Sequence, residues 1–264
     1  MSWLITPTYQ RDPDAEAYIA AVEAADEAAS PGIGALEPAV RLAIIRFVLG
    51  CKENGFWPAI KACCILAGAR TLAGALIPLA GPAPTNVGGL FVSGDYDRET
   101  GLVGDGSTKY LNSNRNADAQ PQNNIHVAAY ATNAGTTGYA LGAGGTASNA
   151  VNLGLPNVVW RLNSNLYQPS GGVNAGLTGM SRSVSTEFIL RRNGANETAA
   201  VASAAPLTTS LFVFGRSAAA STNARLAFYS IGESLPNGPT KTGLQLLDER
   251  VTQLINVDLA AAIP

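Results

Sequence analysis

GLVGDGSTKYLNSN, the stretch Gly101–Asn114, marks the point at which the chain changes character. Apolar residues at helical spacing precede it, whereas Gly, Ser, Thr and Asn dominate the residues that follow. Gly104 and Gly106 flank Asp105 and predict a tight turn, because glycine adopts positive φ without steric cost. Polar and apolar residues alternate after this turn, as in a strand with one buried face. The stretch therefore predicts the start of a β domain.

The residues around this turn are expected to divide between the inside and the outside of that domain. Val103, Tyr110 and Leu111 are expected to point inward. The segment NSNRNADAQPQNN, Asn112–Asn124, is predicted to be a surface loop because it is rich in amides. Its amide groups suit hydrogen bonds to a hydroxyl-rich ligand or merely to water.

Five short apolar runs follow the turn, each about as long as a strand and bounded by turn residues. The runs are NIHVAAYAT, NVVWRLNS, STEFILRR, SLFVFGRS and ARLAFYSIG. This pattern is typical of an antiparallel β-sandwich or jelly roll rather than of βαβ units. Between residues 101 and 214 the only acids are Asp105, Asp118, Glu187 and Glu197.

The N-terminal third predicts helices. Asp12 is suited to cap the first helix, Pro13 fits its first position, and SPGIG (Ser30–Gly34) ends it. Pro38 opens a second helix, whose apolar residues recur at helical spacing up to the glycines at positions 50 and 55. Trp57 and the proline after it predict a third helix, which runs through the adjacent cysteines.

The segment from Ala62 to Ala80 is almost free of charge, with Arg70 as the exception. A membrane span is disfavoured, because an arginine in the middle of a bilayer costs about 2.5–3.5 kcal/mol. A buried helix followed by an apolar extended strip, or contact with a partner chain, explains the composition. Cys51, Cys63 and Cys64 are expected to be buried reduced thiols, since their number and spacing fit neither a disulfide framework nor a zinc site.

The last segment predicts an amphipathic helix. Its apolar residues Leu244, Leu247, Val251 and Leu254 alternate at spacings of three and four, and Asp258 interrupts the stripe. Packing on its own sandwich and a helical seam between copies both stay open. The predicted fold class is α+β, mainly β. The predicted parts are an N-terminal arm (1–11), a helical anchoring or assembly region (12–80), a β-sandwich (81–236) and a C-terminal helix (237–264).

Charge and composition exclude several classes of function. Lys and Arg total 17 against 19 acids, and charged residues make up 14% of the chain, well below the roughly 25% that is usual. The sequence therefore offers no basic surface for nucleic acid. The start, MSWLITPTYQRDPD, lacks the pattern of a secretory signal peptide, so folding in a cytoplasm is expected.

The stretch GLVGDGSTKYLNSN resembles the first core strand of laminin-G-like domains of the concanavalin A-like fold. ARLAFYSIGESL, followed by an amphipathic helix, resembles the closing strand of the same domains. The resemblance implies a concanavalin A-like antiparallel jelly roll between the two motifs.

A second resemblance covers more of the chain. DAEAYIAAVEAADE, GCKENGFWPAIKACCILAGARTLAGALIPL and the segment from APTN through FVSGDYDRETGLVGDGSTKYLNSNRNADAQPQNN are similar to a group of tailed-bacteriophage structural proteins. In that group, helices precede a laminin-G-like domain. The resemblance implies a virion structural protein, assembled in the host cytoplasm with other virion proteins, and a symmetric homo-oligomer with a trimer favoured.

The sequence shows no set of catalytic residues. The only histidine, His126, lies in a predicted strand and is interpreted as structural. The Glu-x-Asp-x-x-Glu run of carboxylates that concanavalin A-like glucanases need does not occur. Asp95 and Asp97 would share one face of a strand, which suits either a Ca²⁺ ion or, more commonly, a charged turn. We therefore expect no catalytic, cofactor or metal residues.

Aromatic residues offer the other route to a ligand. Trp160 is expected in the core, whereas Tyr167 lies in a loop-like context where an exposed ring would suit a sugar. Trp3 forms part of a short apolar arm that would dock on a neighbouring subunit or on its own domain. The expected function is binding without catalysis, by a fibre, spike or capsid or tail appendage that binds host glycans. A purely structural decoration or connector protein is the alternative, and a polysaccharide-degrading enzyme is the third.

Overall fold

The computed structural model describes residues 11–156, 159–217 and 220–264. Two antiparallel sheets form a β-sandwich, and helices lie at both ends of the sequence. The eight-stranded sheet has the order β12 (Ala195–Ala199), β11 (Phe188–Arg192), β10 (Gly176–Arg182), β6 (Ile125–Asn133), β14 (Arg225–Gly232), β4 (Gly101–Val103) and β3 (Tyr96–Asp97), with β1 (Ile60–Ile65) also paired to β14. The six-stranded sheet has the order β2 (Thr85–Asn86), β5 (Leu111–Asn116), β13 (Ser210–Val213), β7 (Tyr139–Ala143), β8 (Val151–Gly154) and β9 (Trp160–Leu162).

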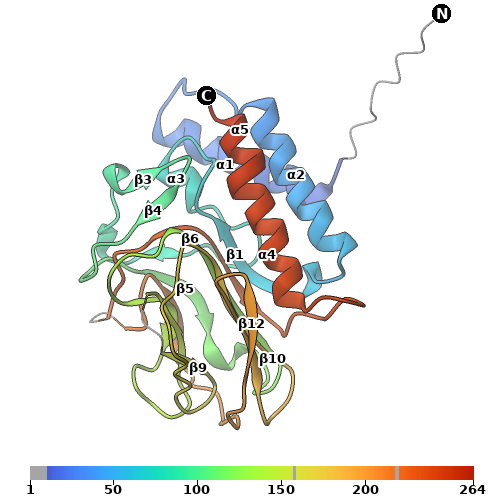
Figure 1. The fold of residues 1–264 in the computed structure, drawn as a ribbon. Helices are drawn as coiled ribbons and strands as arrows, with labels where there is room; N and C mark the ends of the chain where they lie inside the picture. The colour runs from blue at the N-terminus through green and yellow to red at the C-terminus, as the bar shows by residue number, and fades with distance from the viewer. Residues whose placement is uncertain (1–10, 157–158, 218–219) are drawn as a thin grey trace, which may run out of the picture.

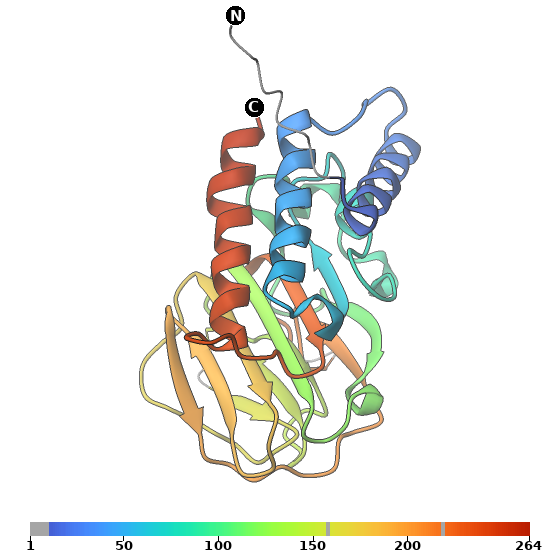
Figure 2. The same ribbon diagram turned by 90° about the vertical axis from the view of Figure 1, so that its right-hand side faces the viewer.

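The helices gather on one side of the sandwich (Figure 1). They are α1 (Pro13–Ala29), α2 (Pro38–Glu53), the short α3 (Leu72–Ala75), and α4 (Gly243–Gln253), which continues through the π-helical η5 (Leu254–Leu259) into α5 (Ala260–Ala262). Single 3₁₀ turns are η1 (Trp57–Ala59), η2 (Val87–Gly89), η3 (Ser93–Asp95) and η4 (Ala117–Ala119). Helices α2 and α4–α5 run side by side over the eight-stranded sheet (Figure 2).

Two hydrophobic clusters separate the molecule into three layers. The first lies between the helices and the outer face of the eight-stranded sheet and includes Phe47, Phe228 and Leu247. The second lies between the two sheets and includes Trp160 and Tyr229. The central strands of the eight-stranded sheet, β6 and β14, are therefore buried on both faces. The outward side chains of the six-stranded sheet belong to neither cluster.

The first two predicted helices are confirmed. The Asp12 carboxylate accepts hydrogen bonds from the backbone N–H groups of Asp14 and Ala15 at 3.0 and 3.2 Å, and α1 begins at Pro13. Helix α2 begins at Pro38 but continues through the glycine at position 50 to Glu53.

The prediction of a third helix is wrong. One 3₁₀ turn follows Phe56, and residues 60–65 then form strand β1, which pairs with β14 in the register Cys64–Tyr229. Side chains of β1 alternate between the two hydrophobic clusters, with Cys63 in the first and Cys64 in the second. Because both faces are apolar, the strand lacks the polar–apolar alternation that would identify it.

The turn inside GLVGDGSTKYLNSN connects the two sheets rather than two neighbouring strands, since β4 and β5 lie in different sheets. Gly106 has φ +74, as predicted. Gly104 is required for another reason, because a Cβ there would lie 2.0 Å from the carbonyl oxygen of Thr222. Leu111 points inward, but Tyr110 contacts the outward-facing ring of Phe212, so its predicted direction is wrong.

Asn112–Asn124 is not one continuous loop. Its first residues belong to β5, and η4 follows.

The C-terminal stripe packs on its own chain. Leu244, Leu247, Val251 and Leu254 are all buried in the helix-side cluster. The Arg191 guanidinium on β11 donates to the Asp248 carboxylate at 2.6 Å and ties this helix to the sheet. These four residues therefore do not form a seam between copies.

Candidate functional site

The outward side of the six-stranded sheet, which we call the open face, combines aromatic, amide and guanidinium groups. Ladder pairing places one row of residues directly side by side across five strands. In order, the row is Asn112, Phe212, Gly142, Asn152 and Arg161. Neighbouring strands lie about 4.8 Å apart, so the row spans the width of a short oligosaccharide.

Aromatic rings occupy one half of the open face. The Tyr110 and Phe212 rings meet edge to face with centroids 5.2 Å apart, and both side chains are half-buried. Edge-to-face pairs of this kind hold each other in one orientation. This half therefore presents a fixed apolar platform.

Guanidinium and amide groups occupy the other half. Arg216 follows β13 and stacks on Tyr139, with its Cζ atom 4.2 Å from the ring centroid. A Cβ on Gly142 would lie 2.7 Å from the Cβ of Arg216, so this glycine makes room for the arginine. The neighbouring strands then supply Asn152 and Arg161.

The loop Gly144–Ala150 holds these polar groups in place. Its Gly145 carbonyl accepts hydrogen bonds from Asn152 Nδ2 at 2.8 Å and from Arg216 Nη1 at 3.1 Å. Its Ala147 carbonyl accepts from Arg161 Nη1 at 3.4 Å. One short loop therefore positions all three side chains.

Three buried polar atoms in this cluster have no hydrogen-bond partner among the described residues. They are Asn152 Oδ1, Arg161 Nε and Arg216 Nε. A buried unpaired donor or acceptor costs about 1–3 kcal/mol. Such a group in a native structure calls for an explanation, for which bound water or a ligand is a common one. Their clustering marks this part of the open face as the best candidate site.

A buried arginine, Arg182, holds strand β9 in place from the core side. Arg182 is 0% exposed, and its guanidinium donates to the Leu162 carbonyl at 2.9 Å. It also donates to the carbonyls of Val184, Ser185, Glu187 and Val201. Because Leu162 directly follows Arg161, this network sets the position of the outward arginine.

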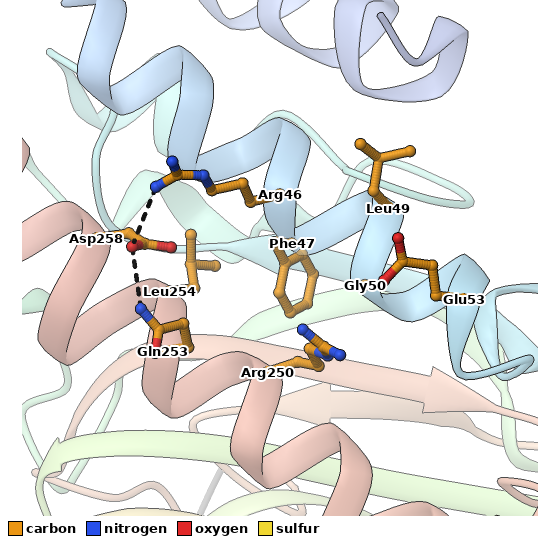
Figure 3. A pocket seen from close by; sticks show the side chains of 9 residues that line it. All are labelled: Arg46, Phe47, Leu49, Gly50, Glu53, Arg250, Gln253, Leu254 and Asp258. Atoms are coloured by element: carbon orange, nitrogen blue, oxygen red, sulfur yellow. Dashed lines mark hydrogen bonds and ion pairs between the residues drawn. The ribbon is translucent and has the colours of Figure 1, made fainter. Parts of the chain in front are cut away.

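A hollow lies on the helical side, in the seam between α2 and α4–η5 (Figure 3). It has a volume of about 440 Å³. The Arg46 guanidinium lies 3.8 Å from the Asp258 carboxylate, and Gln253 Nε2 donates to the same carboxylate at 3.1 Å. Arg250 lies on Gly50, where a Cβ would come within 2.8 Å of the arginine side chain. Together with Glu53, this hollow contains two cations and two carboxylates, so charge does not select a ligand there.

His126 is structural, as predicted. The imidazole is completely buried between the Glu233 carbonyl and the Ser230 hydroxyl, which lies 2.8 Å from Nε2. Burial lowers the pKa of His126 to about 4, so the ring is neutral at pH 7.

Asp95 and Asp97 do not converge on one point. The Asp95 carboxylate accepts from Lys109 Nζ at 2.6 Å, whereas Asp97 caps the turn that includes Thr100. Among the described residues, no group of three or more His, Cys, Asp or Glu side chains has the arrangement of a metal site. The pair therefore forms charged turns.

The predicted aromatic residues lie away from the open face. Trp160 is in the core, as expected. Tyr167 is half-buried, bonds to the Trp160 backbone and packs its ring on Phe188 at 6.1 Å, so it is not an exposed platform. Cys51, Cys63 and Cys64 are free and buried, as predicted, and burial raises the pKa of each thiol. Trp3 and the predicted arm, apart from residue 11, lie outside the described residues.

Among the described residues, no helix combines the length and the apolar character that a membrane span requires.

Comparison with known proteins adds little. No family model matches the chain, and no curated protein matches it. One solved structure that is similar is domain 4 of AbnA, a GH43 extracellular arabinanase from Geobacillus stearothermophilus, in complex with arabinotriose. The identity is 13% and the TM-score is 0.34, over 56% of this chain and 79% of that chain. At these values the likeness supports no inference about function.

Proposed function

We propose that this chain is a non-enzymatic structural protein of a tailed-phage virion whose β-sandwich binds host surface glycans through the open face. The observation that carries the proposal of binding is the in-register row from Asn112 to Arg161, flanked by Tyr110 and Tyr139. Sugars bind to aromatic faces with amide and charged partners beside them. The virion assignment rests on the sequence resemblance described above.

The two sides of the sandwich suit different tasks. Helices cover the outer side of the eight-stranded sheet, while polar and aromatic side chains occupy the outer side of the six-stranded sheet. In this proposal the helical side contacts other virion proteins, and the protein forms a homo-oligomer, with a trimer favoured. The fibre, spike and capsid or tail appendage positions all remain compatible with it.

Binding without catalysis fits the side chains present. The one histidine is buried and fully bonded. Asp258 and Asp95 act in ion pairs, and Asp97 caps a turn. A single site would bind a sugar weakly, with Kd on the order of millimolar, and many copies on one particle would raise the avidity by roughly 10²–10⁴.

The test is adsorption of assembled particles to host cells with and without the sandwich. We expect adsorption to fall when the domain is removed and to recover when it is restored. Unchanged adsorption would favour the alternative, a purely structural decoration or connector protein without a ligand. Release of sugar fragments from host polysaccharide would contradict both.

A further inference from the structure

The open face carries positive charge that no neighbouring acid balances. Its six strands β2, β5, β13, β7, β8 and β9 contain no aspartate or glutamate. Arg161 and Arg216 nevertheless lie on it, and neither forms an ion pair with a described residue. By contrast, Arg98 bonds Glu37 at 2.7 Å, and Arg192 bonds Glu197 at 2.7 Å. The local charge therefore differs from the overall charge of −2.

The two guanidiniums flank one amide. Arg161 and Gly142 are each paired to Asn152 from opposite sides, and Arg216 lies over Gly142. With strands about 4.8 Å apart, the two arginines begin roughly 10 Å from each other. Asn152 between them is 0% exposed, as expected if the long side chains and the loop above cover it.

Several hydrogen-bonding groups of Arg161, Arg216 and Asn152 have no partner among the described residues. Arg161 and Arg216 each have an unpartnered Nε donor and Asn152 has an unpartnered Oδ1 acceptor, but all three atoms are buried, so a ligand on this face meets the outer ends of the two guanidiniums. Each guanidinium bonds the loop through Nη1, and neither Nη2 atom bonds a described residue. Two guanidiniums that each have an Nη2 group without a described partner match the two oxygens of one carboxylate.

We propose that the open face selects acidic saccharides, in which a carboxylate on the sugar ring binds between the Nη2 groups of Arg161 and Arg216. The aromatic pair Tyr110 and Phe212 then contacts the next sugar along the row. This inference rests on the proposed glycan binding and adds the class of sugar. Arginine is suited to this role because it is always charged and its planar group can bond the loop through one nitrogen and a carboxylate through another.

The experiment uses the full chain on an array of bacterial surface saccharides, where each uronic-acid saccharide is printed beside its carboxyl-reduced form. We expect the acidic form to bind at least about tenfold more tightly, as for loss of a charge-assisted hydrogen bond. Arg161→Ala and Arg216→Ala are each expected to abolish that preference, because each removes one of the two cations that hold the carboxylate. Arg46→Ala, which removes an arginine whose side chain is 61% exposed on the helical side, is the matched control.

Arg216→Lys separates charge from shape, because lysine keeps the charge but lacks the fork. We expect it to lose most of the preference while melting like the unmodified protein. Equal binding of acidic and reduced forms would overturn this inference and leave glycan binding standing. Absence of binding to every saccharide would overturn both. Loss of the preference in Arg46→Ala would also contradict the assignment to the open face.

Discussion

The two sheets share one core but differ in what covers their second face. The eight-stranded sheet has helices on its outer side, and its central strands β6 and β14 are buried almost throughout. In the six-stranded sheet, β13 alternates: it buries Leu211 and Val213 and turns Phe212 outward. Outward side chains under the helices therefore contribute to stability alone, whereas outward side chains of the uncovered sheet are available for recognition.

This difference is clearest for two phenylalanines. Phe228 on the eight-stranded sheet is 0% exposed and meets the Phe47 ring of α2 with centroids 5.7 Å apart. Phe212 on the six-stranded sheet is half-buried and meets only Tyr110 edge to face among the aromatic rings. The same residue type therefore acts as core in one sheet and as surface in the other.

Phe228→Ala should give the largest effect, because it opens a cavity where the helices meet the sheet. We expect it to lower the free energy of unfolding by about 3–5 kcal/mol, measured by urea denaturation. The melting temperature should fall by roughly 2–4 °C for each kcal/mol. A loss below about 1 kcal/mol would mean that the helical layer does not depend on this contact.

A second prediction for the eight-stranded sheet concerns the pH dependence of stability, which His126 on β6 should influence. Its pKa is lowered to about 4 in the folded protein by burial, with Arg115 contributing in the same direction, whereas an unfolded histidine titrates near about 6.5. The unfolded chain therefore binds one more proton between these two values. Stability should decrease as the pH falls from about 6.5 toward 4, by up to about 3 kcal/mol.

The matched variant is His126→Asn, which has no histidine at all. Urea midpoints of both proteins are compared at several pH values between 7 and about 5, above the range in which most carboxylates titrate. We expect the variant to be less stable at pH 7, but with a flatter pH dependence than the unmodified protein. Parallel curves would show that His126 is not the group responsible.

Much of this architecture could be predicted from local signals. Asp12 and Pro13 give the start of α1 because capping depends on neighbouring residues alone. All five apolar runs in the β region contain strands, and the C-terminal stripe forms a buried helix face. Strand β1 could not be identified in the same way. Its second apolar face is explained only by the helices that cover it, and these lie elsewhere in the sequence.

The candidate site was less accessible to prediction. Arg161, Asn152 and Arg216 come from three separate segments and are brought together by ladder pairing and by the loop carbonyl of Gly145. No spacing in the sequence links them. One weak signal existed, namely that arginines occur in strands β5 and β9, or directly after β13, in a region with few acids. By contrast, Tyr167 had a loop-like context but bonds to the backbone of Trp160.

Phe212→Ala should have the smallest effect on stability and tests the open face most directly. The ring is half-buried and belongs to neither hydrophobic cluster, so its removal should cost about 1 kcal/mol or less. If the open face binds saccharides, the same change removes half of the aromatic platform and weakens binding, with little change in melting temperature. Phe228→Ala should do the reverse at a temperature where it remains folded, lowering stability while saccharide binding persists. Measuring melting and saccharide binding for both variants therefore distinguishes the two sheets. If Phe212→Ala destabilised the protein as much as Phe228→Ala, the outer side of the six-stranded sheet would be a buried surface rather than a free one.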